Sequence, residues 1–161
     1  MKSLSRNFAL ALFFAFTIGS IYGCAEKPKP ITFAGPGVQI WKLNIVYEKT
    51  GSSFKDQTMV LKPSETEKDV FYVTATIDAE SETESMGRFR SLMEWKGEIR
   101  NGAMICNITG NAYSVRSPEQ GGSALFGEAK GTFSKRRASG TTLLRFEAGL
   151  AQGKWTAERI S

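Results

Sequence analysis

The feature that most constrains the fold is an alternation of apolar and polar residues with a period of two. In "VFYVTATIDA" an apolar residue occupies every second position from Phe71 to Ile77, and in "QIWKLNIVYE" the same holds from Trp41 to Tyr47. Successive side chains of a β-strand point to opposite faces, so this period indicates strands with one buried face. After residue 37 the chain shows no sustained helical apolar stripe. The alternation therefore predicts an all-β domain.

Turn residues divide this pattern into about eight short segments. Besides the two segments quoted, alternating runs occur near residues 54–62, 88–100, 103–110, 123–134, 140–148 and 153–160. Glycine, proline or Asn-Gly pairs separate them, as turns between antiparallel strands require. Regularly spaced short strands are typical of sandwiches and barrels. We expect an antiparallel meander of about eight strands that forms a small barrel or a sandwich.

One hairpin can be assigned residue by residue from its turn. Asn101-Gly102 lies between two alternating runs and predicts a two-residue type I′ turn, which requires positive φ at both central residues. The resulting register places Arg100 opposite Ala103, and directly opposed residues share a face. The face that this register makes apolar consists of Trp95, Ile99, Met104, Cys106 and Ile108. We therefore expect Cys106 to be a buried residue.

The N-terminus has the composition of an export signal. Residues 1–7 carry Lys2 and Arg6 and no acidic residue, and residues 8–22 are almost wholly apolar. A charged start, a short apolar run and a site with small residues define a secretory signal peptide. A transmembrane helix needs about 20 apolar residues, and this run is shorter. The segment is therefore interpreted as a signal.

The end of that segment resembles the lipobox of bacterial lipoproteins. In Ile21-Tyr22-Gly23-Cys24 an aliphatic residue stands three positions before the cysteine and a small residue directly precedes it. Tyr22 stands where that family usually has a small or aliphatic residue. The resemblance implies cleavage before Cys24, attachment of diacylglycerol to the Cys24 thiol, and acylation of the new amino group. In that family an aspartate after the cysteine favours inner-membrane retention, so Ala25 favours the outer membrane, on its periplasmic face or at the cell surface.

These patterns divide the chain into three parts. Residues 1–23 form the predicted signal peptide, and residues 24–37 form the acylated cysteine and a flexible tether that contains Pro28, Pro30 and Pro36. Proline fixes φ and removes a hydrogen-bond donor, so such a stretch is extended. Residues 38–161 form a single all-β domain.

The two cysteines leave an alternative open. We expect an acylated Cys24 and a free Cys106 in the core of the domain. The alternative is a secreted soluble protein with a Cys24–Cys106 disulfide, which an oxidising compartment would permit. That bond would require the N-terminal tether to reach a thiol that faces the core.

Composition excludes several function classes. The sequence has no histidine, so the commonest metal ligand and the usual general base are missing. The 21 basic and 16 acidic side chains leave only a small, dispersed positive excess, which does not indicate nucleic-acid binding. No nucleophile, base and oxyanion arrangement can be identified. We expect no catalytic residue, no cofactor and no metal, and the remaining enzyme alternative is an envelope enzyme with a carboxylate-based site.

The residues that remain as candidates are three tryptophans. Trp41, Trp95 and Trp155 lie on three separate predicted strands and face inward in the expected pattern. Converging side chains of this kind line the cavity of some small barrels. We therefore expect a non-enzymatic, lipid-anchored envelope protein that binds a small apolar ligand in its interior or an envelope protein at a strand edge.

Overall fold

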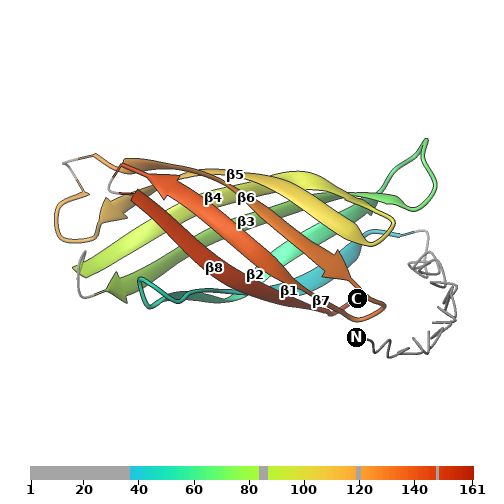
Figure 1. Ribbon diagram of the computed structural model, residues 1–161, viewed down its shortest axis with the longest axis horizontal. Coiled ribbons are helices and arrows are strands. Elements are labelled where there is room, and N and C mark those ends of the chain that lie inside the picture. Colours follow the sequence, from blue (N-terminus) through green and yellow to red (C-terminus); the bar gives the residue numbers. More distant parts are fainter. Residues whose placement is uncertain (1–36, 84–86, 119–120, 148) are drawn as a thin grey trace, which may run out of the picture.

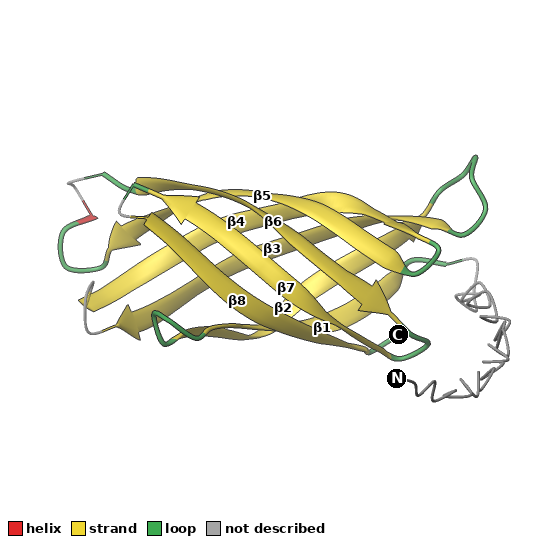
Figure 2. Ribbon diagram, viewed as in Figure 1, coloured by secondary structure: helices red, strands yellow, loops and turns green. Residues whose placement is uncertain are grey.

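The protein forms a closed barrel of eight antiparallel strands that follow one another in chain order (Figure 1). The computed structural model describes residues 37–83, 87–118, 121–147 and 149–161, and Figure 2 shows these to be almost wholly strands and loops. The strands are β1 (Gln39–Tyr47), β2 (Ser52–Pro63), β3 (Val70–Thr83), β4 (Gly87–Arg100), β5 (Ala103–Ser114), β6 (Ser123–Phe133), β7 (Arg137–Phe146) and β8 (Gly149–Arg159). The expected antiparallel meander is confirmed, and it closes as a barrel because β1 also pairs with β8.

The hairpin between β4 and β5 has the predicted turn and register. Asn101 and Gly102 have φ values of 50° and 78°, as a type I′ turn requires. Arg100 pairs with Ala103, and Trp95 pairs with Ile108. The expected faces are also confirmed, because Cys106 is fully buried and Ile105 points outward.

The barrel has two unlike ends. At the filled end β1 begins and β8 ends, together with the turns that join β2 to β3, β4 to β5 and β6 to β7. This end lies on the right in Figure 1, with the C-terminus. At the open end, on the left, β1, β3, β5 and β7 end and the other four strands begin. The described chain therefore enters the barrel, at Gly37 and Val38, at the filled end.

A cluster of aromatic rings packs the filled half of the barrel interior. The ring centroids are 4.9 Å apart for Trp41 and Phe133, 5.9 Å for Phe133 and Trp155, and 6.2 Å for Trp95 and Trp155. Glycine makes this packing fit, since a Cβ atom on Gly131 would lie 2.2 Å from Cζ2 of Trp155. The side chains of this cluster fill the interior of this half of the barrel.

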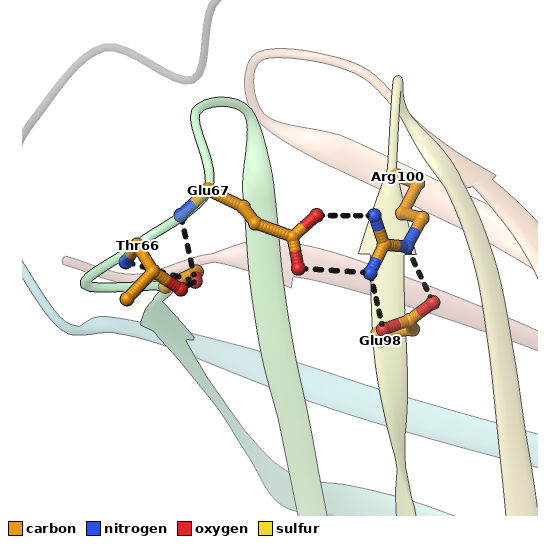
Figure 3. Close-up of polar contacts among 5 residues, drawn as sticks. Thr66, Glu67, Glu98 and Arg100 are labelled. Carbon is orange, nitrogen blue, oxygen red and sulfur yellow. Dashed lines mark hydrogen bonds and ion pairs between the residues drawn. The ribbon is translucent and has the colours of Figure 1, made fainter.

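Charged side chains cover the outer surface and connect neighbouring elements. Arg100, at the end of β4, donates hydrogen bonds to the carboxylates of Glu98 on the same strand and Glu67 in the loop between β2 and β3 (Figure 3). The shortest N–O distance in each pair is 2.6 Å. Because these groups are exposed to water, each pair contributes little to stability. The ion pair between Arg100 and Glu67 connects the β2–β3 loop to the end of β4.

Two parts of the expected domain organisation are outside the described residues. The predicted signal peptide, Cys24 and nearly all of the predicted tether belong to residues 1–36. Over the part of the chain that the structure describes, no helix is long and apolar enough to cross a membrane.

Candidate ligand-binding site

The interior of the barrel contains a cavity of about 440 Å³ at its open end. Its lining includes Tyr47 and Ser114, which are the last residues of β1 and β5, and Ser52 and Ser123, which are the first residues of β2 and β6. The cavity is therefore built by the strand ends opposite the filled end, and every strand except β3 contributes to the described lining.

A row of small side chains across adjacent strands creates this space. Ala79 on β3 pairs with Ser91 on β4, which pairs with Ala112 on β5, and Ala112 pairs with Ser123 on β6. Interior positions of a small barrel are normally filled by side chains. Three of these small residues, Ser91, Ala112 and Ser123, line the cavity, and their short side chains leave its volume unfilled. At the other end of the barrel the tryptophans fill the interior.

The rest of the cavity wall is mostly apolar. The apolar side chains that line it are Phe54, Phe89, Met93, Leu125, Leu144, Phe146 and Ala151, contributed by β2, β4, β6, β7 and β8. Ligand pockets are typically about 300–1,000 Å³ in volume, predominantly apolar, with a few placed polar groups. The size and wall of this cavity match that description.

The polar groups in the cavity are mainly hydroxyls. Ser91 is 2% exposed and lines the cavity, and its hydroxyl makes no hydrogen bond to another described residue. Deeper in the barrel, the hydroxyls of Tyr47 and Thr142 lie 3.4 Å apart. Near the rim, the Thr50 hydroxyl donates to Oγ of Ser52 at 3.0 Å. Ser91 thus offers an unused donor and acceptor inside an otherwise apolar space.

The cavity carries almost no charge. Among the described residues that line the cavity, Glu147, an exposed residue next to the end of β7, is the one carboxylate, and none is a lysine or an arginine. Burial raises the pKa of the Tyr47 hydroxyl to about 12, opposed by its hydrogen bond to Thr142. Tyr47 is therefore protonated and neutral at physiological pH.

The structure brings the three candidate tryptophans together but not around this cavity. Trp41, Trp95 and Trp155 are each at most 1% exposed and belong to the aromatic cluster of the filled half. They are not among the residues that line the cavity. Trp155 donates to the carbonyl of Lys130 at 3.2 Å, so its polar group is also used within the packing. The three tryptophan side chains fill the barrel interior at the end opposite the cavity.

Cys106 is a free, fully buried thiol, as expected. It pairs with Gly97, and burial raises the pKa of its thiol to about 12. A thiol with so high a pKa is protonated and unreactive at neutral pH. Cys24, the candidate lipidation site, lies outside the described residues.

Sequence reasoning missed the cavity residues, although a signal for them exists. Extending the hairpin register beyond Trp95 places Met93 opposite Gly110, Ser91 opposite Ala112, and Phe89 opposite Ser114. The inward face of β5 therefore changes from Ile108 to small residues, and β4 contributes Ser91 at the same level. That change marks the part of a barrel where side chains cannot fill the interior.

The remaining described residues offer no alternative site with metal chemistry. Among residues 37–83, 87–118, 121–147 and 149–161, no group of three or more cysteine, aspartate or glutamate side chains could hold a metal ion. No protein-family model matches the chain, and no curated protein matches it. The candidate site is therefore defined by its geometry alone.

Proposed function

We propose that the protein binds a small apolar ligand in the open end of its barrel, as a non-enzymatic, lipid-anchored protein of a bacterial cell envelope. The observation that carries the proposal is the cavity of about 440 Å³ with its mostly apolar wall. An apolar ligand gains free energy there because it leaves water for a surrounding apolar surface. The sequence "IYGC" at residues 21–24 supports the anchor and hence the envelope location, with the outer membrane favoured by Ala25.

The expected alternative, a partner protein at a strand edge, has less support. Each of the eight described strands pairs with a neighbour on both sides, because β1 and β8 close the barrel. The pairing of β2 with β3 reaches only from Phe71 to Thr76, so residues 77–83 of β3 pair with β4 alone and form a short edge that a partner strand could extend. Because this edge is short and the cavity is a formed pocket, the interior is the better candidate for binding.

The proposal predicts that filling the cavity abolishes ligand binding. Diphenylhexatriene, an uncharged hydrocarbon that fluoresces in apolar surroundings, should bind the purified protein saturably with one molecule per chain. Ala112→Phe places a ring in the centre of the row of small residues and should weaken this binding at least about tenfold. Fluorescence titration gives both affinities.

Ala124→Phe is the matched control. Ala124 lies on β6, points outward and is exposed, so a ring there leaves the cavity unchanged. If Ala112→Phe lowers the thermal unfolding midpoint so far that the protein is not folded, Ser123→Phe at the exposed rim of the cavity replaces it. Failure of the native protein to bind the hydrocarbon saturably, or equal binding by inward and outward variants, would show that the cavity is not a binding site.

A further inference from the structure

We infer that the ligand is an uncharged amphiphile, an apolar chain that carries a hydroxyl or ester oxygen, and not a fatty-acid anion. The inference rests on the proposed function and specifies its ligand. It follows from two properties of the cavity: the hydroxyl groups inside it and the absence of basic side chains from the part of its lining that the structure describes.

The first property is the hydroxyl of Ser91, which belongs to the cavity lining and makes no hydrogen bond to another described residue. A ligand oxygen that reaches this hydroxyl can form a hydrogen bond with it inside a mostly apolar space. Ser91 lies within the apolar wall, between Phe89 and Met93 on the same face of β4. A ligand whose oxygen reaches Ser91 while its chain contacts that wall satisfies both requirements. A pure hydrocarbon would leave the Ser91 hydroxyl unsatisfied.

The second property is the charge of the lining. A buried carboxylate needs a cationic partner, since an unpaired charge in an apolar site is far costlier than an unpaired hydroxyl. No lysine or arginine occurs among the described residues that line the cavity, and Glu147 at its rim is itself acidic. Tyr47, with its pKa of about 12, also stays neutral. An ionised carboxylate would therefore enter without compensation and against the charge of Glu147.

Basic residues on the same strands do not change this conclusion. Arg90 lies on β4 next to Ser91, but strand alternation directs it outward, where its guanidinium bonds both carboxylate oxygens of Asp78 at 2.6 and 2.7 Å. Arg88 is likewise exposed and paired with Glu80 on β3. Both cations are therefore on the outer surface and bound to acidic neighbours.

Three ligands with the same ten-carbon chain test the inference. Decanol, decanoate and decylammonium should each be used to displace diphenylhexatriene from the purified protein at neutral pH, where decanoate and decylammonium are ionised. We expect decanol to displace the probe at a concentration at least about tenfold lower than decanoate. Equal or tighter binding of decanoate would overturn the inference, and tighter binding of decylammonium would do the same by assigning head-group recognition to Glu147.

Three variants identify the groups responsible. Ser91→Ala should weaken decanol binding about fivefold to tenfold and leave diphenylhexatriene binding unchanged, because the hydrocarbon has no polar atom. Ser53→Ala, at an outward position of β2, is the control and should change neither. Glu147→Gln should improve decanoate binding while decanol binding stays constant. Unchanged decanol binding in Ser91→Ala would remove the assigned role of Ser91.

Failure of the inference differs from failure of the proposed function. If the protein binds neither diphenylhexatriene nor any of the three ligands, the ligand-binding proposal itself fails. If the hydrocarbon binds but decanoate displaces it as readily as decanol does, the cavity binds ligands and only the uncharged class is wrong.

Discussion

At the scale of single residues, glycine and cysteine together determine how the β4–β5 part of the interior is filled. A Cβ atom on Gly97 would lie 2.8 Å from Sγ of Cys106 and closer still to the backbone of β5. The missing side chain of Gly97 therefore provides the space that the Cys106 sulfur occupies. This pairing is the physical reason why the second cysteine of the sequence is a core residue.

Burial of Cys106 predicts a loss of stability in alkaline solution. The pKa of its thiol rises from 9.0 to about 12 on folding, so above pH 9 the unfolded chain releases a proton that the folded protein retains. The free energy of unfolding therefore falls as the pH rises from about 9 towards 12, by about 1 kcal/mol at pH 10 relative to pH 8 for this group. Urea unfolding at the two pH values measures the change.

Cys106→Ala is the appropriate comparison for this pH effect. Alanine has no proton to release, so the variant should be less stable at both pH values but should lose about 1 kcal/mol less between them. An identical pH dependence in the native protein and the variant would mean that the Cys106 thiol does not retain its proton on folding.

At the scale of strands, the close contact of β6 with the aromatic cluster sets the packing of the filled half. Gly131 lies on β6, and a side chain there would meet both the ring of Trp155 and the carbonyl oxygen of Ser139, at 2.2 and 2.4 Å. The backbone of β7 and a rigid indole both limit any adjustment. Gly131 is thus required by packing rather than by backbone conformation.

Gly131→Ala should destabilise the protein by about 1–3 kcal/mol, because the added methyl group overpacks the tryptophan cluster. Gly37→Ala is the control, since no heavy atom lies within 4 Å of the Cβ that it would add. Urea unfolding followed by tryptophan fluorescence measures both changes. Equal stability of the two variants would contradict the tight packing of Trp155 against β6.

Much of the element structure was predictable from sequence because its causes are local. Alternation identified the strands, and the Asn101-Gly102 turn fixed the register of β4 and β5. The choice of barrel over sandwich was not predictable, because it depends on pairing β1 with β8 across almost the whole chain. A bulge was also missed: the register of β1 with β2 shifts between Leu43 and Ile45, and Asp56 has a positive φ of 57°.

The candidate site was only partly predictable, because it too depends on how strands distant in sequence pair with one another. Inward-facing tryptophans were identified, but whether they line a cavity or fill the interior depends on the sum of side-chain volumes around each level of the barrel. That sum requires the registers of all eight strands. The register of the β4–β5 hairpin alone predicts one part of this result. It shows that the large pair Trp95 and Ile108 is followed, further along the same face, by the small pair Ser91 and Ala112.

At the scale of the whole molecule, the cavity and the entry of the described chain lie at opposite ends of the barrel. Val38 precedes β1 at the filled end, whereas Ser123 and the other rim residues lie at the open end. If the chain is anchored through Cys24, the membrane attachment joins the barrel from the side of the filled end. Ligand would then enter from the opposite side.

The proposed anchor predicts a defined mature protein. Intact mass spectrometry of the protein purified from bacterial membranes should find a chain that begins at Cys24 and carries a diacylglycerol and an amide-linked acyl chain. Two or three acyl chains hold a protein stably in a bilayer, whereas a single chain holds it marginally. Cys24→Ser should therefore prevent processing at this site and lipid attachment. An unmodified mature chain that begins after Cys24 would contradict the lipoprotein assignment.

The pairing of the first strand with the last also has a kinetic consequence. Trp41 and Leu43 on β1 acquire their partners Arg159 and Ala157 only when the final residues of the chain are present. Contacts so distant in sequence form slowly, because a long loop must be closed before they contribute. A chain that lacks β8 consequently cannot complete the barrel. The cavity, whose wall includes Ala151 of β8, forms only after β8 has paired with β1.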